Sequence, residues 1–259
     1  MLTIRPEQLD VLKRASVQKF EDRMVDHLNA FTPRHFKILN EDEIRDVIQH
    51  GRELAKQHGY RSERSVRLYI EMMFMLGSGF FTDPQYSWIS QIVDRQADVN
   101  ASASIDLINK KTWELVEQAS LDYIDPNGNF DPSRFIEQLR KLHDGLDQFA
   151  SALVKSESTP DISQLLQNAF PHKFNYIGAT AVQHLTAEAN QKTALYQIFT
   201  QRGVAIFAAM MFILGSGFDH DPILPWVPAI LKDPSLSAEN EKIDRLHTEA
   251  LNQLQMFLA

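Results

Sequence analysis

The chain has 259 residues, of which 44% are hydrophobic and 23% charged, an ordinary mixture for a globular protein. Its formal net charge of −8 and the lack of a basic run argue against a nucleic-acid-binding protein, which needs a clustered positive surface. The absence of cysteine excludes disulfides, thiolate metal sites and a cysteine nucleophile. A soluble protein with a sizeable core remains.

Targeting signals are not evident in the sequence. Residues 1–8 contain charges and a proline where a signal peptide needs an apolar stretch. The longest uncharged apolar segment lies between Arg202 and Asp219, and it is shorter than the roughly 18 to 20 residues that span a membrane. We therefore expect a cytoplasmic protein without a membrane span.

In chain order, the first elements are predicted to be helices. Apolar residues recur on one helical face over residues 18–28. Asn40 with Glu43 forms a capping-box pattern that begins a helix over residues 41–58. The next helix, from about residue 63 to Leu76, is apolar nearly all round and should be the buried centre of its unit.

A glycine-rich turn follows this central helix. Gly77 and Gly79 can adopt positive φ where the chain reverses. Asp83 followed by Pro84 predicts the N-cap and first residue of the helix that carries Trp88. A last helix is expected near residues 105–120.

A turn-rich joint, residues 125–131, leads into an extra helix over about residues 132–154. The alternating oxygens of this joint resemble a calcium loop, but the glycine and the twelfth-position ligand are misplaced, which favours a plain turn. The helices of the first part then recur, and Pro225 and Pro228 predict a late or kinked start after Asp221-Pro222. The final helix is expected near residues 243–258.

The recurrence is the strongest signal in the sequence. Residues 64–88 and 202–226 are identical at 13 of 25 positions at a constant offset of 138, and they share the pattern MMF-x-LGSGF-x-x-DP-x-x-x-W. We therefore predict an all-α protein with two tandem copies of a unit of about five helices. The first copy is residues 1–124, and the second, with the extra leading helix, is residues 132–259.

The motifs that could carry chemistry have simpler explanations. The two Gly-Ser-Gly segments follow helices, unlike phosphate loops or a nucleophile elbow, so they are interpreted as helix stops. Asp219-His220-Asp221 is the most site-like triplet, yet only its last aspartate recurs in the first copy, as Asp83. No histidine pair has metal-ligand spacing on a helix. We assign no catalytic, cofactor-binding or metal-binding residues.

Partner contact is the alternative use for this turn. Phe81 occupies a loop position where the second copy has Asp219, so the fold does not require an aromatic residue there. Spacing places Gln85 and Tyr86 on the outer side of the following helix. The candidate partner-binding residues are Phe81, Gln85, Tyr86, Asp219, His220 and Leu224. Trp88 and Trp226 recur, and they are expected to be buried anchors under the turn.

Charge is divided unevenly between the copies. Residues 1–124 carry 16 basic and 19 acidic side chains, whereas residues 125–259 carry 10 and 15. The second copy is therefore expected to be covered, either by the first copy or by another protein.

The segments FEDRMVDHL, HGRELAKQHGYRSERSVRLYIEMMFMLGSGFFTDP and ILGSGFDHDPILPWVPAIL resemble a family of small helical proteins encoded beside effectors of bacterial type VI secretion systems. Members of that family usually have one such unit. The resemblance implies an accessory role, in which the protein holds or loads an effector as a chaperone or co-chaperone. It brings no catalytic residues with it.

Three hypotheses follow. The leading one is a non-enzymatic protein that binds a secreted effector or an adaptor. The second is an immunity protein that neutralises a toxin. The third is a hydrolase or metal-dependent enzyme that uses the region of Asp219, His220 and Asp221.

Overall fold

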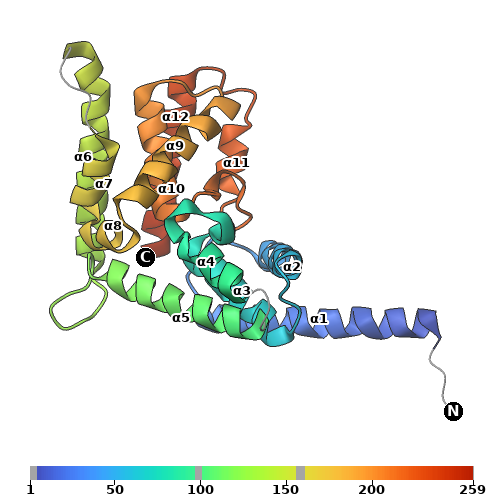
Figure 1. Ribbon diagram of the computed structural model, residues 1–259. Coiled ribbons are helices and arrows are strands. Elements are labelled where there is room, and N and C mark those ends of the chain that lie inside the picture. The colour runs from blue at the N-terminus through green and yellow to red at the C-terminus, as the bar shows by residue number, and fades with distance from the viewer. Residues whose placement is uncertain (1–4, 97–100, 156–160, 259) are drawn as a thin grey trace.

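The computed structural model describes residues 5–96, 101–155 and 161–258, and this part of the chain is all-α (Figure 1). It contains twelve α-helices and four short 3₁₀ turns, and its only β-type pairing is a single bridge between Ile124 and Phe130. The elements up to the joint are α1 Pro6–Phe31, η1 His35–Lys37, α2 Glu41–Gln57, α3 Glu63–Leu76, η2 Phe80–Thr82, η3 Pro84–Tyr86, α4 Trp88–Gln96 and α5 Ala101–Ser120. The later ones are α6 Pro132–Lys155, α7 Ile162–Ala169, α8 Pro171–Ile177, α9 Ala179–Leu195, α10 Gln201–Leu214, η4 Phe218–His220, α11 Trp226–Leu231 and α12 Glu239–Leu258.

The element bounds follow the sequence offset. Adding 138 to the bounds of α2, α3, η2 and α5 gives the bounds of α9, α10, η4 and α12. α4 and α11 also begin 138 residues apart, at Trp88 and Trp226. Below, residues 1–124 are called the first half and residues 132–259 the second half.

Local signals set the helix ends. The capping box of α2 is present, because the Asn40 side chain accepts from the Glu43 N–H and the Glu43 side chain accepts from the Asn40 N–H. Ser62 caps α3, and Thr200, its counterpart, caps α10 through the N–H of Gly203. These caps fix equivalent starts for the two central helices.

The central helices α3 and α10 lie in two hydrophobic clusters, one mainly from each half. Corresponding ring pairs lie in the two clusters at nearly the same spacing. The ring centroids of Tyr69 and Phe80 are 4.8 Å apart, and those of Phe207 and Phe218 are 4.7 Å apart. The expected buried centre of each half is therefore built from the helix before the glycine turn and the phenylalanine after it.

Helix α6 covers part of the second half. It packs along α7 and α10, and it buries Leu139, Leu142 and Leu146. Beneath it, α10 has buried Ala205 and Ala209 where α3 has Arg67 and Glu71. The second half is thus covered in part by its own extra helix, an arrangement that the sequence analysis did not consider.

The joint between the halves is an ordinary turn. Both the Asn127 and the Asn129 N–H donate to Oδ1 of Asp125, at 2.8 Å each, and Gly128 has a φ of +84°. Asp125 thus closes an Asx-type turn with its side chain, in agreement with the turn interpretation.

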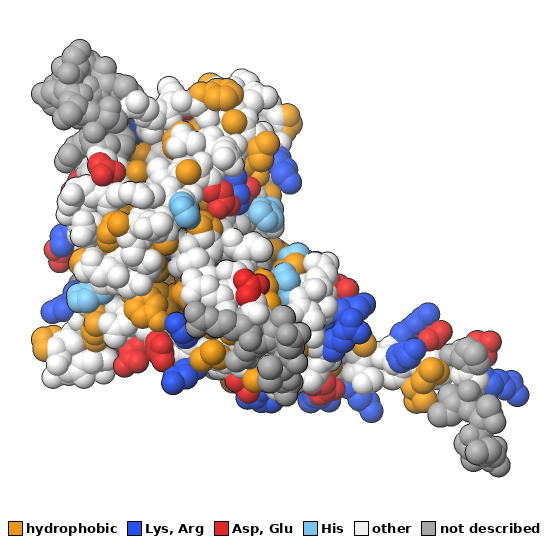
Figure 2. Space-filling model, in the orientation of Figure 1, with side chains coloured by type: hydrophobic (Ala, Val, Ile, Leu, Met, Phe, Trp, Pro, Cys, Tyr) orange, Lys and Arg blue, Asp and Glu red, His pale blue; other side chains and the backbone are white. Residues whose placement is uncertain are grey.

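The N-terminal part of α1 projects from the body (Figure 1). Of the described side chains between Glu7 and Lys19, all are exposed except the half-buried Val17. Figure 2 shows charged side chains along this projection and hydrophobic ones scattered over the surface of the second half. The core of the molecule begins at Phe20.

Candidate functional site

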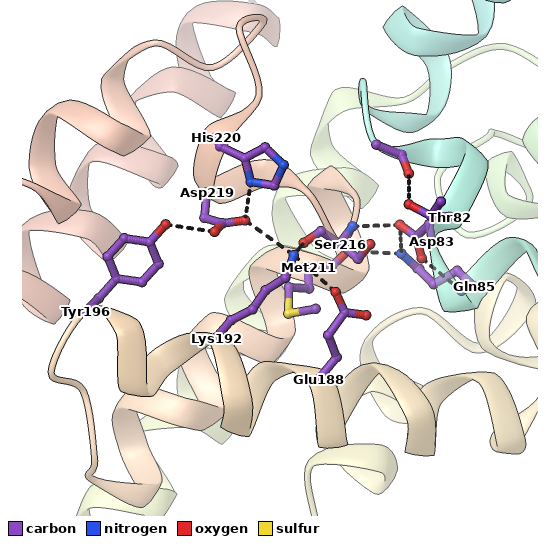
Figure 3. A network of polar contacts seen from close by, with 11 residues as sticks. Thr82, Asp83, Gln85, Glu188, Lys192, Tyr196, Met211, Ser216, Asp219 and His220 are labelled. Atoms are coloured by element: carbon purple, nitrogen blue, oxygen red, sulfur yellow. Dashed lines mark hydrogen bonds and ion pairs between the residues drawn. The ribbon is translucent and has the colours of Figure 1, made fainter. Parts of the chain in front are cut away.

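The two glycine turns meet face to face, and each is held by an aspartate of the other half. The Ser216 N–H donates to Oδ2 of Asp83 at 2.6 Å (Figure 3). The Ser78 N–H donates to Oδ2 of Asp221 at 2.7 Å. Both relations join the same sequence positions, 138 residues apart, so the contact is self-complementary in the manner of a two-fold interface. We call these four residues the clasp.

The second carboxylate oxygen of each aspartate accepts a hydrogen bond from a backbone N–H of its own half. Oδ1 of Asp83 accepts the Gln85 N–H at 2.8 Å, and Oδ1 of Asp221 accepts the Ile223 N–H at 2.9 Å. This is the expected capping role, although it begins the 3₁₀ turn η3 in the first half and not α4. Burial raises the pKa of both carboxyl groups, while the hydrogen bonds from Ser216 and Ser78 oppose it.

The glycines have a second role beyond helix termination. Gly77 and Gly215 do have positive φ, at +91° and +98°. A Cβ on Gly77 would lie 2.7 Å from the Leu214 carbonyl oxygen. Gly79 has an ordinary φ of −84°, so the positive φ expected there is wrong. A Cβ on Gly79 would lie 3.3 Å from the Cα of Gly217, so this glycine allows the two turns to approach.

Gln85 and Tyr86 do not face outward as predicted. They are only 1% and 3% exposed. The amide of Gln85 donates to the Met211 carbonyl oxygen at 3.0 Å, which adds another link between the halves. The spacing argument failed because these residues form a 3₁₀ turn and not an α-helix, and because the second half covers them.

Phe81 is also less free than the sequence indicates. Its ring stacks on His58 at 3.7 Å between centroids, and it contacts the rings of Tyr69 and Phe80. It is a half-buried member of the first core and not an isolated loop aromatic. Phe81 therefore contributes to the packing of the first half.

Asp219 is the centre of a polar network on the second half (Figure 3). It is only 4% exposed, although it was predicted as a surface contact. The Tyr196 hydroxyl donates to it at 2.8 Å, Lys192 lies 3.4 Å away and His220 lies 3.1 Å away. Burial opposes the charge, but these three partners together hold the pKa of Asp219 at about 2.

His220 is the exposed member of this network. Its side chain is 64% exposed, and the hydrogen bond to Asp219 raises its pKa above the usual value. In the described residues no serine or threonine hydroxyl is hydrogen-bonded to it, and no group of three or more histidine, aspartate or glutamate side chains could hold a metal ion. The arrangement presents an imidazole at the surface that is hydrogen-bonded to a buried carboxylate.

Leu224, Trp88 and Trp226 are half-buried. Leu224 and Trp226 pack against the second core, and Trp88 packs against the first. The tryptophans occupy equivalent positions, as expected, but neither is fully buried.

Of the residues whose side chains the structure describes, the two most exposed large apolar ones were missed by the sequence analysis. Leu195 and Phe199 are 77% and 71% exposed, on the turn between α9 and α10 that also carries Tyr196. Their first-half counterparts are Gln57 and Arg61, so the fold itself does not require apolar residues there. The repeat comparison could have found them. We call Leu195 and Phe199 the apolar pair.

Comparison of the chain with protein-family models, with curated proteins and with solved structures finds no match. Within the part of the chain that the structure describes, no helix combines the length and hydrophobicity needed to cross a membrane.

Proposed function

We propose that this protein is a cytoplasmic, non-enzymatic binding protein that serves as a chaperone or co-chaperone for a type VI secretion effector. The resemblance of the repeated motif to accessory proteins encoded beside such effectors supports the role. The family assignment and the partner belong to the proposal.

One observation carries the binding part of it, namely the exposed apolar pair. Large apolar side chains that a fold does not require are costly to keep in water, and aromatic residues at interface centres supply much of the binding energy. Leu195 and Phe199 extend from the same turn as Tyr196, whose hydroxyl reaches Asp219. The apolar pair thus stands next to a fixed polar network that includes exposed His220, which suits a contact with an apolar centre and a polar rim.

The test is a quantitative capture experiment. The tagged protein and the effector encoded beside its gene are co-expressed, and the stoichiometry and Kd are measured. The double variant Leu195→Ser/Phe199→Ser is expected to weaken binding at least tenfold while its melting temperature stays close to that of the parent. The matched control is Gln57→Ser/Arg61→Ser, which changes the equivalent positions of the first half and should leave binding intact.

His220→Ala separates this proposal from the enzymatic one. A residue at the rim of a contact contributes little, so binding and effector delivery are expected to be retained. Loss of effector delivery in a folded His220→Ala protein with intact effector binding would instead favour catalysis. If deletion of the gene kills cells exposed to sister cells, the immunity hypothesis replaces the chaperone role.

A further inference from the structure

A cavity of about 580 Å³ lies where the two halves meet, on one side of the clasp. Its walls come from both halves and are mostly apolar, with Phe74, Phe212, Trp226, Leu254 and Phe257 among them. Cavities of this size and character are typical of sites for small organic ligands.

The cavity exists because the two halves differ at corresponding positions. Ile38 and Leu39 of the first half line it. Their counterparts, Tyr176 and Ile177, do not line the cavity. Both pack against the hydrophobic cluster of the first half, where α8 lies along α5, and Ile177 also packs against that of the second half. The first half has only the short turn η1 in place of α8, and this turn leaves the space beside α12 open.

The charges on the cavity wall are unbalanced. The Arg34 guanidinium lies 5.2 Å and 5.8 Å from the ring centroids of Phe130 and Phe257, and no carboxylate of the described residues forms an ion pair with it. Both oxygens of Asp221, which also lines the cavity, are taken by the N–H groups of Ser78 and Ile223. Arg34 is thus a cation held between aromatic rings with its hydrogen-bonding fork free for a ligand.

The other two basic residues of the wall, Lys173 and His35, make hydrogen bonds and ring contacts within the protein. Lys173 donates to the Phe212 carbonyl oxygen, and its Nζ lies 4.7 Å from the Phe212 ring centroid. His35 is hydrogen-bonded to Thr32 and packs edge-on against Phe74 and Phe257. Arg34 is therefore the basic residue of the wall whose side chain has no hydrogen bond or ion pair among the described residues, and most of the rest of the cavity offers an apolar surface.

From this combination we propose that the cavity binds a straight-chain fatty acid, with its carboxylate on Arg34 and its alkyl chain among the aromatic and aliphatic side chains of both halves. A carboxylate can accept two parallel hydrogen bonds from a guanidinium, which a neutral head group cannot match. This inference does not depend on the proposed chaperone role.

Decanoate is the probe for the test, and decan-1-ol is its neutral counterpart. Binding is measured on the full chain by calorimetry, and by the fluorescence of Trp226, which lines the cavity. We expect saturable one-to-one binding of decanoate below its micellar concentration, and at least tenfold weaker binding of decan-1-ol. Arg34→Met, which keeps the aliphatic stem, should weaken decanoate binding at least tenfold and leave decan-1-ol binding unchanged.

Two further variants keep the result interpretable. Arg14→Met, at an exposed arginine of the projecting part of α1, should bind decanoate like the parent. Leu254→Trp should fill the cavity and weaken both ligands, with circular dichroism confirming that it is folded. The inference is overturned if the parent shows no saturable decanoate binding, if decan-1-ol binds equally well, or if Arg34→Met has no more effect than Arg14→Met.

Discussion

The backbone N–H of Ser216 donates to Oδ2 of Asp83 across the contact between the halves, 133 residues apart in the sequence. The same bond recurs in the opposite direction between Ser78 and Asp221. The repeated LGSG and DP segments therefore form part of the contact between the halves, in addition to ending one helix and starting the next turn. Substitutions in these segments should therefore destabilise both the local turn and the contact between the halves.

Replacing Asp83 with alanine should cost more stability than removal of a helix cap. Two buried N–H groups, of Ser216 and Gln85, lose their acceptor, at about 1 to 3 kcal/mol for each group left unsatisfied. The control is Asp161→Ala, because Asp161 caps α7 through the Ser163 N–H and is exposed. Its loss should cost only about 0.5 to 2 kcal/mol. Urea unfolding measures both, and equal losses would show that the bond between the halves contributes nothing.

Gly77→Ala should be more destabilising than Gly59→Ala. Both glycines have positive φ, +91° and +86°, so an alanine is strained at either position by about 1 to 2 kcal/mol. Only at Gly77 does the new Cβ also meet a backbone atom, the Leu214 carbonyl oxygen at 2.7 Å, whereas nothing lies within 4 Å at Gly59. The difference between the two unfolding free energies therefore combines the closeness of the halves with the extended backbone of Gly77, whose ψ is 153° and which is strained for any residue but glycine. A smaller loss at Gly77 would contradict this geometry.

Gln197→Gly should stabilise the protein. In the described residues Gln197 is the only non-glycine with positive φ, at 59°, and it occupies the position of Gly59 after the corresponding helix. Glycine removes the steric cost of this conformation, and its greater freedom in the unfolded chain offsets part of the gain, which leaves about 0.5 to 1 kcal/mol. The reverse change, Gly59→Gln, should lower the melting temperature. If Gln197→Gly lowers it instead, side-chain contacts of Gln197 outweigh the strain.

His35 should make the protein sensitive to mild acid. Burial lowers its pKa from 6.5 to about 4, so the unfolded chain binds its proton first as the pH falls. The stability associated with neutral His35 is fully present above pH 6.5 and is lost as the pH falls towards 4. His35→Gln should therefore show a shallower decline of unfolding free energy between pH 6.5 and 4, by up to about 1.4 kcal/mol per pH unit. Above pH 7 the unfolding free energies of the two proteins should change in parallel with pH. If they also change in parallel below pH 6.5, His35 is not the group responsible for the loss of stability in acid.

The sequence predicted what local rules determine. The capping box of Asn40 and Glu43, the end of α3 at Gly77 and the all-helical class follow from hydrogen bonds and periodicity within a few residues. It did not predict the clasp, because Ser78 and Asp221 are distant neighbours that a linear pattern does not reveal. The same serine and aspartate occur at the corresponding positions of both copies. This repetition is consistent with a two-fold contact, in which each residue type occurs on both sides.

The candidate site was less predictable than the fold. Asp219 was predicted to contact a partner, yet it is only 4% exposed and accepts a hydrogen bond from the hydroxyl of Tyr196, 23 residues earlier. The apolar pair was overlooked because its residues look like ordinary core positions until they are compared with Gln57 and Arg61. Whether an apolar side chain is buried depends on which other parts of the fold pack against it, and Leu195 and Phe199 face solvent.

Because both sides of the clasp belong to one polypeptide, their association is intramolecular, with an effective concentration set by the connection and not by the number of molecules in the cell. Dilution cannot separate them. The partners of a true homodimer must also keep identical surfaces, whereas this tethered pair is free of that constraint. One half can present Leu195 and Phe199 while the other keeps Gln57 and Arg61 at the corresponding positions, so the linkage permits different surfaces on the two halves.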